Sequence, residues 1–166
     1  MQTSDSGATP LRFPQQGNAH QDKTLTPPTR PGEWSLAQIQ EALSRPLPNS
    51  YLKRLKDTGN ALYLPWWRAN RVLDKYAPGW TFEIRQTLLS SDRIFMIGRL
   101  TIPTSEGNVY REASGTEELK REKYNSETGE IEIKELAYGD PSSNAESMCF
   151  RRCCSRFGLG LNLYYK

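Results

Sequence analysis

The sequence predicts an α+β domain, in which helices pack against a three- to four-stranded antiparallel β-meander. Apolar residues recur at helical spacing in two early segments, three later segments have strand patterns, and an amphipathic helix follows them. The chain has 166 residues, which suggests one domain. We assign residues 34–166 to it. Residues 1–33 are rich in Pro, Gln, Thr and Gly and lack apolar periodicity, so we expect a disordered N-terminal tail.

Two helices are expected before the strands. Ser35 can cap a helix over 36–43 that Pro46 ends. Pro65 is suited to be the first residue of a second helix, over 65–77. The apolar residues of each helix recur at three- and four-residue spacing: Leu36, Ile39 and Leu43 in the first, and Trp66, Ala69, Leu73 and Tyr76 in the second.

Three strands are predicted after the second helix. Residues 80–89 alternate between apolar and polar, 93–102 are β-branched and apolar, and 109–115 follow a Glu-Gly-Asn turn. Together they predict an antiparallel meander. We expect the highly charged residues 116–130 to form a mobile connection, and residues 131–136 to form a further short strand.

The last predicted helix begins in the segment "GDPSSNAE". Ser142 or Ser143 is expected to be its N-cap, with Glu146 three residues after Ser143 as in a capping box. A helical projection separates two arcs of side chains. The buried arc holds Cys149, Phe150, Cys153, Cys154 and Phe157, and the other holds Arg151, Arg152 and Arg156.

The residues after this helix do not form a phosphate-binding loop, because such a loop precedes a helix. Gly158 is instead expected to end the helix in a left-handed conformation. Leu159, Leu161 and Leu163 then alternate, which predicts a short extended segment.

The sequence gives little support for a metal site, a cofactor site or a membrane-spanning segment. Free cysteines on a buried arc behave as small hydrophobes, and the single histidine, His20, lies in the tail. No apolar run approaches the length of a membrane span, and the N-terminus lacks a signal-peptide pattern. Asp5 and Asp22 argue against a transit peptide. We therefore expect no cofactor and a cytoplasmic, nucleoid-associated protein.

Three segments in order resemble the single-strand DNA annealing proteins of the Rad-fifty-two type, which include relatives such as the bacterial DNA-damage-response protein A and the mitochondrial genome maintenance annealing proteins. The signature is a helix with adjacent basic residues that runs into Phe-Gly and a glycine-spaced apolar tail, here Arg151-Arg152, Phe157-Gly158 and "LGLNLY". The resemblance covers roughly residues 35–166, and its segments are "YLPWWRANRVLDKYAPGWTFEI", "VYREASGTEE" and "AYGDPSSNAESMCFRRCCSRFGLGLNLY".

This resemblance implies a non-enzymatic single-strand annealing domain with a β-β-β-α core that assembles into homo-oligomeric rings. It further implies ATP-independent binding and annealing of single-stranded DNA in homologous recombination and repair, with recombination proteins as further partners. By position, the implied phosphate contacts are Arg68, Arg151 and Arg152, with Arg156 on the same face. The cations Arg99, Arg111, Lys120 and Arg121 are either surface charge or a second, outer DNA contact.

Alternatives stay open at this point. The aromatic residues Tyr63, Trp66, Trp67 and Tyr110 either pack in the core or in a subunit interface, or stack on bases. The chain is alternatively a nucleic-acid-binding or scaffold module that does not anneal strands. A third hypothesis is a metal-dependent nuclease that uses Glu132-Ile-Lys134 and Glu112.

Overall fold

The computed structural model describes residues 26–54, 61–135 and 140–165. Most of the expected tail, residues 1–25, lies outside the described residues. None of the described helices is long and apolar enough to cross a membrane. The elements follow the chain in the order α1 (Leu36–Leu43), η1 (Asn49–Tyr51), β1 (Lys53–Arg54), β2 (Leu62–Tyr63), α2 (Trp66–Tyr76), β3 (Thr81–Leu89), β4 (Arg93–Thr104), β5 (Gly107–Glu118), β6 (Lys120–Tyr124), β7 (Ile131–Glu135), α3 (Pro141–Ser155) and η2 (Leu161–Tyr164).

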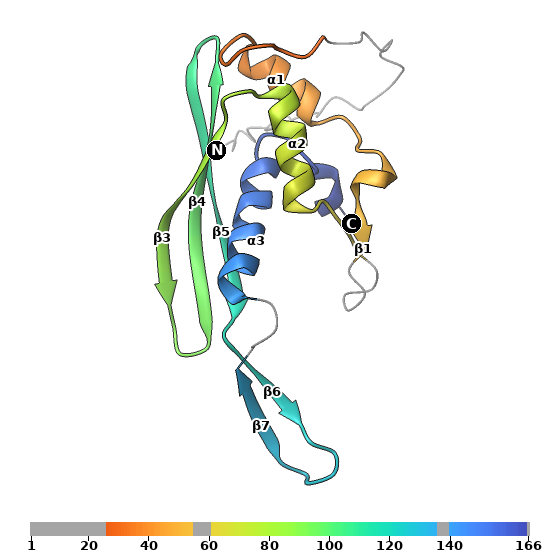
Figure 1. Cartoon of the computed structure of the whole chain (residues 1–166), viewed down its shortest axis with the longest axis vertical. Helices are drawn as coiled ribbons and strands as arrows, with labels where there is room; N and C mark the ends of the chain where they lie inside the picture. The colour runs from red at the N-terminus through yellow and green to blue at the C-terminus, as the bar shows by residue number, and fades with distance from the viewer. Residues whose placement is uncertain (1–25, 55–60, 136–139, 166) are drawn as a thin grey trace, which may run out of the picture.

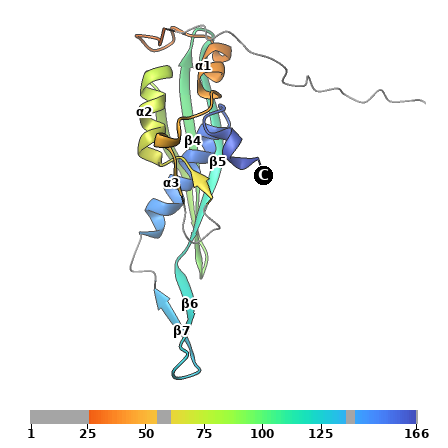
Figure 2. The same cartoon turned by 90° about the vertical axis from the view of Figure 1, so that its right-hand side faces the viewer.

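A three-stranded antiparallel sheet in the order β3-β4-β5 forms one layer of the domain. The three α-helices lie on the same side of this sheet (Figure 1, Figure 2). The predicted α+β class and the antiparallel meander are therefore confirmed. A β-bulge between Ile84 and Gln86 shifts the register of β3 against β4. Such a bulge exchanges the two faces of the strand, so side chains before and after it point to opposite sides.

The alternation along β4 separates the covered face of the sheet from the opposite face. Side chains at even positions, such as Leu100 and Ile102, are fully buried in the core shared with the helices. Side chains at odd positions, such as Phe95 and Arg99, point to the opposite face and keep part of their surface exposed. No described helix covers that opposite face (Figure 1).

Two glycines let α3 approach the covered face closely. A Cβ on Gly115 of β5 would collide with the backbone carbonyl of Ala145 in α3, and it would lie 2.6 Å from the backbone nitrogen of Cys149. A Cβ on Gly98 of β4 would lie 2.7 Å from the Cys149 sulfur. The backbone of α3 therefore rests directly on β5, and no side chain fits between them at this point.

The two early helices form as expected, with small differences at α2. Ser35 caps α1 in a capping box with Gln38. Pro65 is the N-cap of α2 rather than its first helical residue. α2 buries Ala69, Val72 and Leu73, whereas half of the Trp66 surface is exposed. Of the alternatives left open for Trp66, packing in the core of the described chain is therefore excluded.

The charged connection predicted over 116–130 is not a loop. β5 continues to Glu118, and β6 and β7 then pair as an antiparallel hairpin that extends away from the helices (Figure 1). A backbone hydrogen bond of 2.9 Å from Asn125 to Glu130 closes its turn. The loop prediction is wrong because the two charged segments pair through their backbones over five residue positions, from Lys120 opposite Glu135 to Tyr124 opposite Ile131. The predicted strand over 131–136 exists, but it pairs with β6 instead of joining the main sheet.

α3 begins earlier than predicted, because its N-cap lies two residues before Ser142. Asp140 is the N-cap, and Pro141 follows it in the first turn. The Asp140 carboxylate accepts bonds from the Ser142 backbone N–H at 3.0 Å and from the hydroxyls of Ser142 and Ser143 at 2.6 and 2.9 Å. These bonds lower the pKa of Asp140. The predicted serine caps are wrong, because both serines already lie within the helix and donate to the true cap.

The C-terminal segment turns back as a helix rather than extending. Arg156 is the C-cap of α3, and Gly158 follows in the predicted left-handed region with φ 104°. Gly160 repeats this conformation with φ 68° and starts η2. The predicted extended segment is wrong, because two left-handed glycines wind the chain into a 3-10 turn. Leu159, between them, is buried.

The contact between Gly115 and α3 yields a stability prediction. Gly115→Ala should lower the free energy of unfolding by about 1–3 kcal/mol, because the new methyl group forces α3 away from β5. Denaturant unfolding measures this change. Ser114→Ala, on the opposite face of the same strand, is the matched control and should stay within about 0.5 kcal/mol of the parent. Equal stability of the two variants would contradict the packing described.

Candidate nucleic-acid interface

The three cysteines of α3 are part of the core, as predicted. Cys149, Cys153 and Cys154 are free and buried. The thiols of Cys149 and Cys153 donate to the carbonyls of Ala113 at 3.0 Å and Gly98 at 3.3 Å. The described residues contain no cluster of three or more His, Cys, Asp or Glu that could hold a metal ion. These contacts attach α3 to both strands beneath it and assign the cysteines to structure.

Arg151 lies in a groove beside α3. Its guanidinium carbon stands 5.6 Å from the centre of the Tyr63 ring, within reach of a cation–π interaction. The side chain is half-buried, and this burial lowers the pKa of its guanidinium, while Tyr164 and Tyr63 oppose the shift. The group nevertheless stays charged at neutral pH. Arg151 is therefore a cation held partly out of water at one fixed place.

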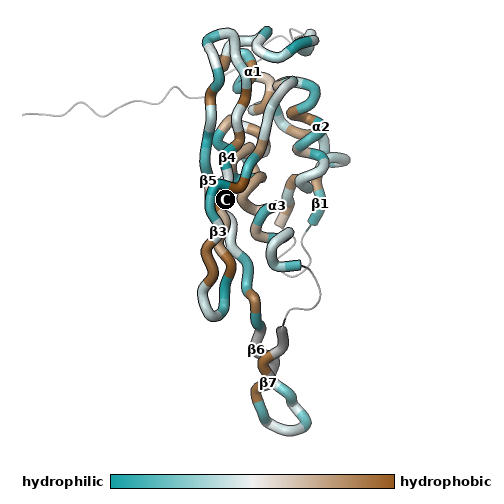
Figure 3. Tube along the Cα trace, turned by 60° about the vertical axis from the view of Figure 1, so that its left-hand side comes forward, coloured by the Kyte–Doolittle hydropathy of each residue, from teal (hydrophilic) through white to brown (hydrophobic). Residues whose placement is uncertain are grey.

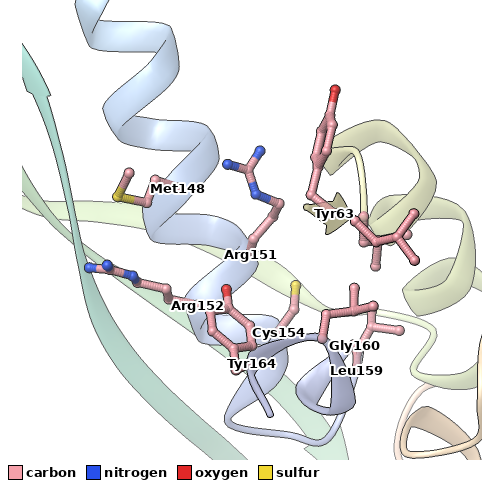
Figure 4. Close-up of a pocket in the computed structure, with 11 residues that line it drawn as sticks. Tyr63, Met148, Arg151, Arg152, Cys154, Leu159, Gly160 and Tyr164 are labelled. Atoms are coloured by element: carbon pink, nitrogen blue, oxygen red, sulfur yellow. The ribbon is translucent and has the colours of Figure 1, made fainter. Parts of the chain in front are cut away.

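The groove has a volume of about 210 Å³. Figure 4 shows Arg151 pointing from α3 into the space next to Tyr63, with Tyr164 of η2 on the other side. Its floor is apolar and is lined by Leu62, Leu64, Cys154, Leu159 and Leu163. An apolar floor with cations and phenol rings at its walls suits an anionic chain with an organic backbone.

The other two arginines of α3 are exposed. Arg152 donates to the Ser114 carbonyl of β5 at 3.0 Å and thereby lies over the edge of the sheet. Arg156 follows one turn later at the helix end. The projection places Arg151 on one exposed face with these two residues. In the structure Arg151 and Arg152 both line the groove, but only Arg151 is half-buried. The β1–β2 hairpin and η2 cover Arg151, and neither element could be positioned from the helix sequence.

Arg68 of α2 belongs to a second group of cations. Its guanidinium carbon lies 4.5 Å from the Trp67 ring, and the Lys53 ammonium lies 5.9 Å from the same ring. Lys53 pairs with Tyr63 across the β1–β2 hairpin, and Tyr63 in turn contacts Arg151. We call Arg68, Lys53, Arg151 and Arg152 the cationic stripe, because contacts connect them from α2 across the hairpin to α3.

Sequence reasoning missed the contribution of β1. Lys53 and Arg54 lie in a segment whose pattern indicates only a short basic turn. Arg54 pairs with Leu62, which lines the groove. The signal available was two adjacent cations after Tyr51 and Leu52. Their position beside α3 depends on the pairing of β1 with β2, which a two-residue strand does not reveal in sequence.

Arg99 and Arg111 lie apart from the stripe. Arg99 is on the uncovered face of the sheet, where it pairs with Glu112 at 2.8 Å and approaches Glu83 at 3.9 Å. The bond with Glu112 raises the pKa of Arg99. Arg111 stands 5.4 Å from the Phe157 ring at the end of α3. The charge of Arg99 is thus already compensated within the chain.

The two cations of β6 and the nuclease candidates are also separate from the groove. Lys120 is exposed on the hairpin, and the backbone of Arg121 pairs with that of Lys134. Glu132 is on β7 of this hairpin, while Glu112 bonds to Arg99 on the main sheet. The described residues therefore do not gather the two glutamates into a metal cluster.

The four aromatic candidates divide by location. Trp66, Trp67 and Tyr110 are exposed, and Tyr63 is half-buried at the groove. Tyr110 stacks beneath Arg99, with 4.2 Å between the guanidinium carbon and the ring centre. None of these rings belongs to the buried core of the described chain. Tyr63 and Trp67 contact the cations of the stripe, so they form part of the candidate interface.

A cation-lined groove on an α+β domain is a feature expected of a nucleic-acid-binding module. No family model matches the chain. It is 33% identical over 134 residues to DNA repair RAD52-like protein 1, mitochondrial, of Arabidopsis thaliana, which covers 79% of this chain and 68% of that protein. It is 34% identical over 143 residues to DNA repair RAD52-like protein 2, chloroplastic, of the same plant, which covers 83% of this chain and 63% of that protein. The chain therefore belongs to the family of RAD52-like DNA repair proteins, which confirms the resemblance.

The buried cysteines yield a chemical prediction. All three thiols should resist a thiol-specific reagent in the native protein and react only as denaturant unfolds it. The main reason is burial, which keeps the reagent away from all three thiols. Burial also raises the pKa of the Cys154 thiol, and the hydrogen bond with Cys149, together with burial, raises the pKa of Cys153, whereas the same bond lowers the pKa of Cys149. A chelator should leave the thermal midpoint unchanged. Fast labelling of the native protein would contradict the core assignment.

Proposed function

We propose that this chain binds single-stranded DNA through its phosphate backbone and anneals complementary strands without ATP, in recombination and repair. The observation that carries the proposal is Arg151, a half-buried cation in an apolar groove within the cationic stripe. Its relatives are named DNA repair RAD52-like proteins, which supports a role in repair. The proposed role is binding and not catalysis, and it requires no cofactor.

Electrostatics favour a phosphate as the partner of Arg151. Partial burial removes water from a charge, which costs free energy unless an opposite charge comes close. No ion pair among the described residues involves Arg151, in contrast to Arg99 with its two glutamates. Arginine binds phosphate oxygens through two parallel bonds. A DNA backbone in the groove would therefore compensate a charge that the described chain leaves without an acid.

Backbone binding explains how such a surface could promote annealing. Phosphate contacts carry no sequence information, and they release counterions, so affinity falls as salt rises. Bases that the protein leaves exposed can sample a complementary strand, and base pairing then supplies the free energy. The proposal also includes a location for the protein, which is the cytoplasm, in association with the DNA of the nucleoid. Recombination proteins are its proposed further partners.

A homo-oligomeric ring is a further part of the proposal, supported by two apolar patches. The arm patch consists of Tyr124, Ile131 and Ile133 on the β6–β7 hairpin, and the sheet-end patch consists of Leu88, Leu89 and Phe95. Figure 3 shows hydrophobic colour at both places. An isolated two-stranded hairpin is marginally stable in water, so its apolar face favours contact with another surface. Head-to-tail contacts between two different patches close into rings when the rotation allows it.

Gel-shift titration with single- and double-stranded DNA tests the proposal. The parent protein should prefer single strands and bind them much less tightly as salt rises. The double variant Arg151→Ala, Arg152→Ala should abolish binding and annealing. If weak binding persists, the slope of log affinity against log salt concentration should be shallower by roughly 0.7 for each phosphate that the variant no longer neutralises. Equal affinity for duplex would favour the alternative of a nucleic-acid-binding module that does not anneal.

The matched control for that experiment is Arg71→Ala with Arg85→Ala. It removes the same charge from exposed positions outside the stripe. The control should keep nearly all of the binding, and both double variants should keep the parent's native mass and circular dichroism spectrum. If the control weakens binding as much as the double α3 variant does, net charge rather than the groove explains binding.

A separate prediction concerns assembly. Ile131→Ser with Ile133→Ser should reduce the native mass, because it removes two exposed apolar side chains from the arm patch. Native mass spectrometry or light scattering measures the change. Ser126→Ala with Thr128→Ala, in the hairpin turn, is the control that should leave the mass unchanged. An unchanged mass in the isoleucine variant would show that the arm patch does not join subunits.

A further inference from the structure

A second cleft lies on the other side of the α2 N-terminus from the groove. It has a volume of about 240 Å³ and opens between α2, β3 and α3. Four aromatic side chains line it, namely Trp66, Trp80, Phe82 and Phe150, together with the polar groups of Asn70 and Glu146. The volume is below that of drug-sized pockets, so the cleft suits one small flat group.

The aromatic floor of this cleft is held rigidly. The Trp80 indole N–H donates to the Asp74 carboxylate at 2.8 Å. Phe150 packs against Trp80 with 5.6 Å between ring centres, and it meets Phe82 edge-on at 5.0 Å. These contacts fix three rings before any ligand arrives. A preorganised aromatic surface stacks a flat ring with little entropic cost for ordering its own side chains.

The mouth of the cleft combines an exposed ring with hydrogen-bonding groups. Trp66 is half exposed, so part of its ring surface is available to a ligand in the cleft. Asn70 lies one helical turn after Trp66, and no hydrogen bond to a described residue engages its amide. Glu146 on α3 adds an exposed carboxylate. Amide and carboxylate groups pair with the exocyclic amines of adenine and cytosine.

The cleft and the cationic stripe are built on the same two helices, α2 and α3. Phe150 of its floor directly precedes Arg151 on α3, and Trp66 directly precedes Trp67 and Arg68 on α2. Trp67 itself contacts two cations of the stripe. A strand whose phosphates lie on the stripe would therefore bring its bases beside the cleft.

We propose that this cleft binds one unstacked nucleobase of the single strand, with preference for amine-bearing bases. The proposal rests on the proposed function and deepens it, because the cleft would hold the register of a strand that the stripe holds by its phosphates. One captured base among several free ones leaves most bases available for pairing. The floor of Trp80, Phe82 and Phe150 stacks the base, Trp66 covers it, and Asn70 and Glu146 contact its edge.

The experiment compares two ligands of equal length, an oligodeoxyadenylate and an abasic oligonucleotide with the same phosphates. The parent should bind the base-bearing ligand about tenfold more tightly. Trp66→Ala should bring the ratio of the affinities for the base-bearing and the abasic ligand close to one, while the affinity for the abasic ligand stays the same. Trp66→Phe, which retains a ring, should keep most of the ratio. 2-Aminopurine in the strand should be quenched on binding to the parent and not to Trp66→Ala.

The same titration with other homopolymers measures the preference of the cleft for bases that carry an exocyclic amine. Oligodeoxythymidylate, which has no exocyclic amine, should bind less tightly than the adenine and cytosine oligomers, and Asn70→Ala with Glu146→Ala should reduce that difference. If the ratio of affinities for base-bearing and abasic ligands is the same for every base, the proposed role of the two polar residues is overturned.

Three outcomes separate failure of the base site from failure of the proposed function. If the parent binds neither ligand, the proposed function itself falls. If the parent binds both ligands equally, or if Trp66→Ala weakens both equally, the base site falls and backbone binding stands. If Trp66→Ala lowers the native mass and the ratio survives, the cleft is a contact between copies of the chain, and the base site falls.

Discussion

The close contact between α3 and β5 is the constraint on which the rest of the structure depends. Gly115 lets the helix backbone touch the strand backbone, and the thiols of Cys149 and Cys153 bond to the carbonyls of the two strands below. A helix seated this deeply cannot rotate without breaking these bonds. The rotation of α3 about its axis therefore determines where Arg151 and Arg152 emerge, so core packing positions the charged surface.

The electrostatic character of that surface comes from unequal burial of similar residues. Arg99 lies between two carboxylates on an uncovered sheet face, and its charge is met within the chain. Arg151 lies among leucines and tyrosines, and burial lowers its pKa instead. A desolvated cation interacts more strongly with an arriving anion than a hydrated one does. This difference is why we propose the groove, rather than another basic part of the described chain, as the place where a phosphate binds.

Much of the fold could be predicted because its signals are local. The Ser35 cap, the β-branched and apolar strand β4, the cysteine arc of α3 and the left-handed Gly158 each depend on neighbouring residues, and each is present. The errors have two origins, either a pairing partner distant in sequence or a competing local hydrogen bond. Charges suggested a loop where β6 and β7 pair, and serines suggested a cap where Asp140 accepts their hydrogen bonds.

The sequence by itself determined the α+β class, the buried cysteines and the presence of an arginine-rich helix face. Each of these depends on the spacing and type of residues that lie close together in the chain. Tertiary structure alone decided which arginine is half-buried, because β2, which precedes α3 in the chain, and η2, which follows it, both line the groove around Arg151. It also brought Lys53 into line with Arg68, through a ring that both cations share. Desolvation of a charge depends on what covers it, and the covering elements come from segments whose own patterns predict neither their pairing nor their place.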